Sequence, residues 1–227
     1  IMNENDIAAV LTTLKLAGVT TIILILIGTP ISWWLSQTKW RYKVLIEALF
    51  AMPLILPPSV LGFYLLIFLS PQGIMGKLLK FLGLQPIAFT FEGLVFGSVV
   101  YSMPFVIQPL QNTFASIGSR PLEVAATLGA SPLDRFLSIV IPMSRNGFLS
   151  AAVLGFAHTI GEFGVVLMIG GNIPGETKVL SISIYDHVEM LAYDNAHLLS
   201  KILLIFSFVL LVTVYSLNRH FSFIRSN

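Results

Sequence analysis

The residues of this chain that could take part in chemistry are few, and His158 and Glu162 form the most conspicuous pair. They lie four positions apart, so one face of a helix would carry both. Two ligands are too few for a metal site, and the letters HTIGE do not match the zinc-protease pattern HExxH. The chain has no GxSxG pattern and no cysteine, which excludes thiol chemistry and disulfides. The sequence therefore predicts no catalytic residue and no metal site.

Glu162 nevertheless stands inside a long apolar stretch, where a carboxylate is costly and is commonly functional. We expect it to pair with a cation or to accept hydrogen bonds from an adjoining helix. His158 is its nearest local partner. The pair is therefore predicted to hold a gate together.

Composition indicates what surrounds this pair. Hydrophobic residues make up 56% of the 227 residues and charged residues only 11%, against about 25% charged in ordinary soluble domains. Most of the surface therefore cannot face water, and we predict an integral membrane protein in contact with lipid. A net charge of +2, with scattered basic residues, argues against a nucleic-acid partner.

Five apolar segments are long enough to cross a bilayer as helices. They cover residues 9–35, 44–69, 89–115, 146–170 and 198–217. No soluble domain fits between them, so residues 1–227 are predicted to form a single transmembrane domain. The fold class is an all-α membrane helix bundle with five spans, or six if residues 171–197 re-enter the bilayer.

Basic residues in the short loops predict the orientation, because Lys and Arg are retained on the cytoplasmic side. One side collects eight of them: Lys39, Arg41, Lys43, Arg120, Arg135, Arg145, Arg219 and Arg225. The other side collects Lys77, Lys80, Lys178 and Lys201. The N-terminus is thus predicted outside, and the C-terminus and residues 116–145 inside. The aromatic residues Trp33, Trp34, Trp40 and Tyr42 are expected to form an interfacial belt at the inner end of the first span.

The cytoplasmic stretch "PLEVAATLGASPLDRFLSIVIP" (121–142) has the local signals of a helix, a turn and a second helix. The first helix should start near Ser119 and end at Gly129 in a left-handed conformation. The second should begin at Ser131 as N-cap, with Pro132 at its first position and Asp134 completing a capping box, and stop at Pro142. Local chemistry alone equally allows an amphipathic loop lying on the lipid surface.

The spacing of Glu123, Ala125, Gly129, Ile139 and Pro142 resembles the cytoplasmic signature EAA, three residues, G, nine residues, IxLP of permease subunits of binding-protein-dependent ABC importers. The departures are Val124 and Ile141. The resemblance implies the type I importer fold. It also implies a homodimer of permeases in a bacterial inner membrane, with two cytoplasmic ATP-binding subunits and an external binding protein. The ATPase-coupling residues would be Glu123, Ala125, Ala126, Gly129, Ile139 and Pro142.

Two further stretches, "MPLILPPSVLGFYLL" (52–66) and "GEFGVVLMIGGNIPGETKVLSISIY" (161–185), are similar to molybdate permease subunits. Sulfate permeases share a related G-E-[FY]-G run. The Ile-Pro-Gly after Gly171-Asn172 and the later Ile184-Tyr185 favour molybdate or tungstate, with sulfate or thiosulfate as the alternative.

Candidate pathway residues follow from the same two stretches. Prolines inside the second span should bend it and form a wall of the pathway. Neutral hydroxyl and amide groups suit transient contact with an oxyanion, whereas Glu162 would repel one. The candidates are Pro53, Pro57, Pro58, Ser59, His158, Thr159, Glu162, Asn172 and Thr177.

No nucleotide site is predicted in this chain. The closest approach to a phosphate-binding loop, "PQGIMGKLL", has Pro71 for the first glycine and Leu78 for the Ser or Thr that holds magnesium. ATP and Mg²⁺ are therefore expected on a partner subunit, with no cofactor here. A secondary transporter is the less favoured alternative, because the sequence has one deep acid and no evident internal repeat.

Overall fold

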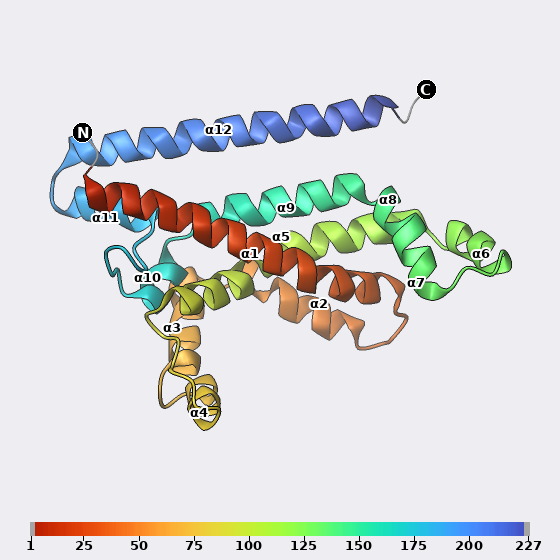
Figure 1. Ribbon diagram of the computed structural model, residues 1–227, viewed down its shortest axis with the longest axis horizontal. Helices are drawn as coiled ribbons and strands as arrows, with labels where there is room; N and C mark the ends of the chain where they lie inside the picture. The colour runs from red at the N-terminus through yellow and green to blue at the C-terminus, as the bar shows by residue number, and fades with distance from the viewer. Residues whose placement is uncertain (1–2, 225–227) are drawn as a thin grey trace.

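The computed structural model describes residues 3–224, and every regular element in that part of the chain is helical (Figure 1). The prediction of an all-α fold is confirmed. In chain order the elements are α1 (Glu4–Gln37), α2 (Lys43–Ala51), the 3-10 turn η1 (Met52–Leu54), α3 (Pro58–Leu69), α4 (Ile74–Phe81), α5 (Phe91–Ile117), α6 (Arg120–Thr127), α7 (Pro132–Arg135), the π-helical turn η2 (Phe136–Val140), α8 (Ile141–Met143), α9 (Arg145–Ile160), α10 (Gly164–Gly170), α11 (Leu180–Glu189) and α12 (Tyr193–Ile224).

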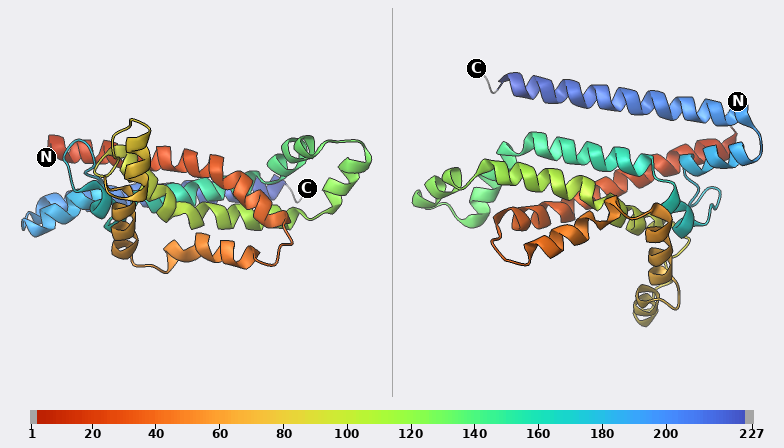
Figure 2. Two further views of the ribbon diagram at one scale, coloured as in Figure 1. Left: turned by 90° about the horizontal axis from the view of Figure 1, so that it is seen from below. Right: turned by 180° about the vertical axis from the view of Figure 1, so that it is seen from behind.

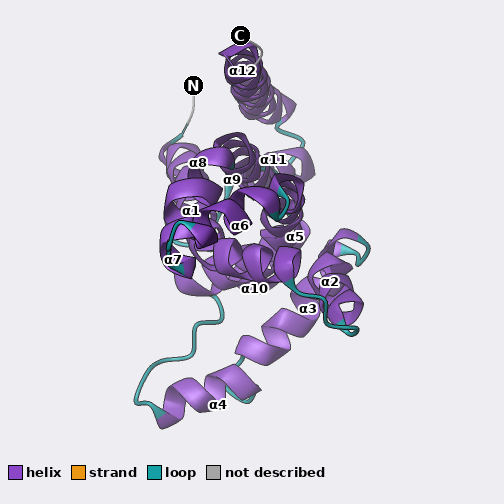
Figure 3. Cartoon of the chain, turned by 90° about the vertical axis from the view of Figure 1, so that its right-hand side faces the viewer, coloured by secondary structure: helices purple, strands orange, loops and turns teal. Residues whose placement is uncertain are grey.

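The long helices α1, α5 and α9 pack lengthwise and enclose the main core. Its buried side chains include Leu24 of α1, Val106 and Leu110 of α5, and Ala151 of α9. Gly155 lets α9 approach α5 closely, because a Cβ there would lie 2.7 Å from Val106 Cγ2. Helix α12 runs beside this bundle but stands apart from it, attached mainly through α11 (Figure 3).

Four helical segments are long and apolar enough to cross a membrane: Glu4–Gln37, Pro58–Phe81, Phe91–Ile117 and Tyr193–Ser216. A fifth is obtained if Pro132–Met143 and Arg145–Ile160, which meet at a bend of 71°, count as one span. The predicted membrane bundle is thus confirmed. Two of the predicted span boundaries are wrong, because helices are interrupted inside residues 44–69 and inside 146–170.

The first interruption lies at the prolines of the second predicted span. Pro53 falls in η1, Pro57 has extended backbone, and Pro58 is the first residue of α3. Since proline donates no backbone hydrogen bond, the run of prolines ends one helix and starts another rather than bending a continuous one. Helix α3 then projects sideways from the long helices and carries α4 at its far end (Figures 1 and 2).

The second interruption lies at Gly161, Glu162 and Phe163, between α9 and α10. The predicted span 146–170 is therefore two helices. Residues 171–197, considered above for re-entry, form a loop and α11, which is not among the candidate spans. Helix α11 is tied to α1, where Asp6 accepts hydrogen bonds from Ser183 at 2.7 Å and pairs with His187 at 2.9 Å.

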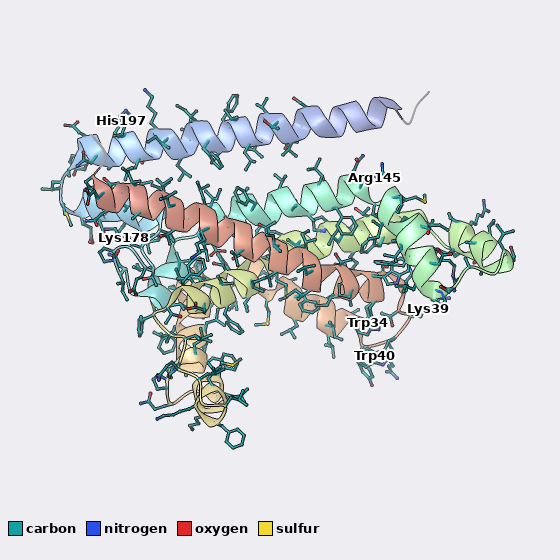
Figure 4. The ribbon with its side chains drawn as sticks, in the orientation of Figure 1. Trp34, Lys39, Trp40, Arg145, Lys178 and His197 are labelled. Carbon is teal, nitrogen blue, oxygen red and sulfur yellow. The ribbon has the colours of Figure 1, made fainter. Side chains whose placement is uncertain are left out.

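The two ends of the bundle carry different groups of residues (Figure 4). Lys39 and Arg145 lie at the end where α6 and α7 are found, and Lys178 and His197 lie at the opposite end, near the N-terminus. Two of the basic residues used to predict the orientation cannot be placed at either end. Arg225 lies outside the described residues, and the side chain of Arg219 is not described.

One aromatic assignment is corrected. Trp34 and Trp40 are about half exposed at the end of α1, as a belt requires. Trp33 instead points into the core, with its ring 5.7 Å from Phe114 and 5.4 Å from Phe136. Successive residues of a helix lie about 100° apart around its axis, so Trp34 can be exposed while Trp33 packs against the core.

Candidate functional site

The two helix interruptions lie against each other, although about a hundred residues separate them in sequence. A Cβ on Gly164, the first residue of α10, would lie 2.8 Å from Cβ of Pro58, the first residue of α3. Further along, a Cβ on Gly62 would lie 2.9 Å from Cβ of Met168. The absence of side chains at both glycines therefore allows α3 and α10 to pack in close contact.

A cavity of about 580 Å³ opens at this junction. It is lined by residues of α3, α5, α9, the α9–α10 link and the start of α10: Pro58, Ser59, Tyr101, Ala157, His158, Gly161, Glu162, Phe163 and Gly164. Irregular backbone at membrane depth is tolerated where it is covered by protein or lines a cavity. The interruptions before α3 and before α10 both border this cavity.

Glu162 is 2% exposed, and α5 supplies its hydrogen-bond donors. Ser98 donates to Oε2 at 2.5 Å, and Ser102 donates to Oε1 at 2.7 Å. Ser181 donates to the backbone carbonyl of the same residue. The carboxylate thus fastens the α9–α10 link to α5, which agrees with the predicted hydrogen bonds from an adjoining helix.

His158 lies beside Glu162, with Nδ1 at 3.6 Å from Oε1 and 2.9 Å from the hydroxyl of Ser102. Its ring stacks on Phe105 at a centroid distance of 3.9 Å and tilts against Tyr101 at 4.6 Å. The side chain keeps 19% of its surface exposed, on the side of the cavity. Among the described residues, no cluster of three or more His, Asp or Glu side chains is placed to hold a metal.

The remaining pathway candidates fall into two groups. Pro58 and Ser59 line the cavity. Thr159 is buried and does not line it; its hydroxyl lies 3.0 Å from the Ser102 hydroxyl and donates to the carbonyl of Gly155. Pro53 is buried in η1, and Pro57 precedes α3 without lining the cavity.

Asn172 and Thr177 are not brought to the cavity. The Thr177 hydroxyl donates to the Gly170 carbonyl at 2.6 Å and accepts from the Ile173 amide at 3.0 Å, which closes the loop after α10. Asn172 donates its amide to both oxygens of Asp186, which also pairs with Lys178. The Thr177 hydroxyl and the Asn172 amide nitrogen thus hold the loop together, and neither residue lines the cavity.

At the far end of the bundle, residues 119–143 form the expected helix, turn and helix. Gly129 has φ +86°, the left-handed conformation that ends α6. Ser131 caps α7 by accepting from the Asp134 amide at 3.2 Å. The Asp134 carboxylate accepts from Ser138 rather than returning to the cap, so only half of the predicted capping box forms. The helix continues through Pro142 and ends at Met143.

This helical pair exposes apolar side chains. Leu128 is 83% exposed and Leu133 67% exposed, with Val124 and Leu137 also largely uncovered. Of the predicted coupling residues, Glu123, Ala126, Gly129 and Pro142 are exposed, whereas Ala125 and Ile139 are half-buried. Leu122 packs back against the main core and fixes α6 to the bundle.

Comparison with known proteins assigns the chain to a family. The family described as binding-protein-dependent transport system inner membrane component matches residues 25–223. The chain belongs to this family. The permease is 56% identical to the molybdenum transport system permease protein ModB of Azotobacter vinelandii, over 96% of each chain. It is 29% identical to the sulfate transport system permease protein CysT of Salmonella typhimurium, over 97% of this chain and 79% of that one.

A solved structure carries the same fold. It is that of a bacterial alginate ABC transporter in complex with an alginate-pentasaccharide-bound periplasmic protein, and a chain of it matches with a TM-score of 0.78. The match covers 97% of the permease and 80% of that chain at 17% identity. The predicted ABC transporter permease architecture is thus confirmed at the level of fold.

Ser98 and Ser102 of the permease were not among the candidates predicted from sequence. Both are fully buried and hold the Glu162 carboxylate. Their spacing of four, which puts two hydroxyls on one face of an apolar helix, was a usable signal. Sequence alone could not indicate that this face turns toward Glu162.

Proposed function

We propose that the permease is the transmembrane subunit of an ATP-driven importer of molybdate, with tungstate as an equivalent tetrahedral oxyanion. The 56% identity to a molybdenum transport permease supports molybdate over sulfate, for which the relative described above is 29% identical. The whole chain would act as one transmembrane domain of a bacterial inner membrane. Sulfate import is the second candidate, because that relative aligns with 97% of the permease.

The observation that carries the proposal is the meeting of the two helix interruptions at the cavity. Pro58, Ser59, His158 and Glu162, all inferred from sequence to belong to the pathway, line this one space. In our proposal the oxyanion passes here, and Pro53, Pro57 and Thr159 shape the surrounding wall. The carboxylate of Glu162, held by hydrogen bonds from two serines of α5, acts as a brace or gate rather than as a ligand.

ATP hydrolysis would occur on a separate subunit carrying ATP and Mg²⁺. The α6–α7 pair would dock into that subunit through Val124, Leu128, Leu133 and Leu137, since apolar side chains exposed at a membrane protein's aqueous end favour burial against protein. The coupling residues Glu123, Ala125, Ala126, Gly129, Ile139 and Pro142 belong to this docking region. This end would be cytoplasmic, together with the C-terminus.

The remaining partners follow from the same assignment. A second copy of the permease would complete the pathway, and an oxyanion-binding protein would dock at the opposite end, where the N-terminus lies outside the cell. The alginate transporter with a bound periplasmic protein supports this kind of partner.

Uptake by proteoliposomes tests the proposal. The permease, purified with the ATPase that accompanies it, is reconstituted, and a molybdate-binding protein is added outside. We expect molybdate uptake that needs ATP on the ATPase side and ceases when the ATPase subunit is removed. Uptake without ATPase would establish a secondary transporter. Greater uptake of sulfate than of molybdate, each with its own binding protein, would establish the sulfate alternative.

A further inference from the structure

The two nitrogens of His158 have different surroundings. Nδ1 points inward, 2.9 Å from the Ser102 hydroxyl. Nε2 makes no hydrogen bond to a described residue, yet it is not among the buried polar atoms that lack a partner. Because His158 lines the cavity, Nε2 is the ring nitrogen open to whatever occupies that space.

Hydrogen bonding around Ser102 determines which nitrogen carries the proton in the neutral ring. A hydroxyl has one hydrogen to donate. Ser102 donates to Glu162 Oε1 at 2.7 Å, so its oxygen must accept from His158. Thr159 does not change this count, because its own hydroxyl donates to the Gly155 carbonyl at 3.0 Å. Neutral His158 therefore carries its hydrogen on Nδ1.

This tautomer leaves a lone pair on Nε2, which repels an oxyanion. A second proton converts Nε2 into a donor and gives the ring a positive charge. A charge on the ring would lie beside a carboxylate, because Nδ1 is 3.6 Å from Glu162 Oε1, and the Phe105 ring stacks on the imidazole. Among the residues that line the cavity or touch the ring, the other titratable groups are Glu162 and, on α5, Tyr101, while α3 contributes only uncharged Pro58 and Ser59.

We propose that His158 is the oxyanion-contacting residue of the permease, that Nε2 takes up a proton from solvent when the anion enters the cavity, and that Ser102 is the positioning residue that holds the ring for this contact. The inference rests on the proposed function. The inference gives His158 and Glu162 different roles. The His158 imidazolium contacts the anion, and the Glu162 carboxylate balances the positive charge of the imidazolium.

The first experiment compares variants of the reconstituted complex across pH. His158→Gln keeps an N–H donor without a titrating charge. In the proposal only the protonated ring offers a donor on Nε2, so the ratio of wild-type to His158→Gln molybdate uptake should fall severalfold as the pH is raised from 6 to 8. The ratio cancels the pH dependence of the partner subunits. A ratio that stays constant with pH would overturn the proposal.

Two serines provide matched variants on the same helix. Ser102→Ala removes the acceptor for Nδ1, and its uptake should lose the wild-type pH dependence. Ser98→Ala removes only the other donor to Glu162, so it should keep the wild-type profile at reduced stability. Equal loss of pH dependence in both variants would mean that the effect passes through Glu162, and Ser102 would not be a positioning residue.

Nitrogen NMR of the full permease, labelled with ¹⁵N-histidine, supplies a readout independent of transport. The His158 signal is assigned by its loss in His158→Gln, and at pH 8 it should be that of the Nδ1–H tautomer. An Nε2–H tautomer would overturn the inference even in a transporting complex. A wild-type complex that imports no molybdate at any pH would overturn the proposed function and this inference with it, whereas a constant uptake ratio in an active complex overturns the inference alone.

Discussion

At the scale of single residues, the permease buries the Glu162 carboxylate and surrounds it with hydrogen-bond donors. Ser98 and Ser102 are fully buried, and each donates its only hydroxyl hydrogen to Glu162. Buried polar groups are stable only when paired, and removing one partner costs more than the pair contributes. The site is therefore sensitive to loss of the carboxylate and tolerant of changes that keep an acceptor.

Glu162→Ala should destabilise the folded permease by about 1 to 3 kcal/mol for each of the two buried serine hydroxyls that it leaves without an acceptor. Thermal unfolding in detergent and stimulated ATPase activity measure the effect, which should be alike for molybdate and sulfate. Glu176→Ala, at an exposed acid of the loop after α10, is the control and should have little effect. A changed preference between the two anions at full stability would mean that Glu162 contacts the substrate.

At the scale of elements, two features have local causes: the helix breaks and the turn between α6 and α7. Consecutive prolines stop the helix before α3, and Gly129 adopts a left-handed conformation that β-branched residues resist. Gly129 has open space around the position of a Cβ, so the cost of a side chain there is backbone strain rather than collision.

Gly129→Val should uncouple transport while leaving the bundle folded, since strain of about 1 to 2 kcal/mol distorts only the α6–α7 turn. Glu123→Lys should do the same by reversing an exposed charge of α6. Gly83→Val is the matched control, because Gly83 also has positive φ (+74°) and open space but lies in the loop after α4. Molybdate-stimulated ATPase activity and uptake are compared at equal membrane levels. Normal uptake by Gly129→Val would remove the coupling assignment, as would equal loss in Gly83→Val.

At the scale of the whole molecule, the arrangement separates the two regions for which we propose a function. The cavity lies where α3, α5, α9 and α10 meet, and the α6–α7 pair lies at the end of the bundle away from the N-terminus. Helix α5 ends just before α6, and α9 begins just after α8. If the α6–α7 pair moved with a partner subunit, these two helices would transmit the movement to the cavity, where they carry Ser102 and His158. The orientation of the helix bundle in the membrane determines which partners can reach the α6–α7 end and which can reach the end near the N-terminus.

Cysteine labelling tests the orientation, and the native chain contributes no competing thiol. Thr127→Cys on α6 and Lys77→Cys on α4 are both at exposed positions. In intact cells Lys77→Cys should react with a membrane-impermeant maleimide, and Thr127→Cys should need a permeant one, as the distribution of basic residues predicts. The reverse pattern would place the α6–α7 pair outside and separate it from a cytosolic ATPase.

The sequence by itself determined what depends on neighbouring residues. Long apolar segments predicted a membrane bundle, and Gly129 and Ser131 predicted the turn and cap near the coupling loop, because hydrophobic length, φ preference and capping act over a few positions. The spacing of His158 and Glu162 predicted their contact for the same reason.

Only the tertiary structure decided which groups meet across the bundle. Ser98 and Ser102 reach Glu162 across 64 and 60 residues of chain. The helix interruptions before α3 and α10 lie against each other. Trp33 packs into the core, and Thr177 closes the loop after α10. The physical reason is that hydrogen bonds and close packing between distant segments depend on the rotation and depth of whole helices. These are set by the sum of many apolar contacts, and no short stretch of sequence records them.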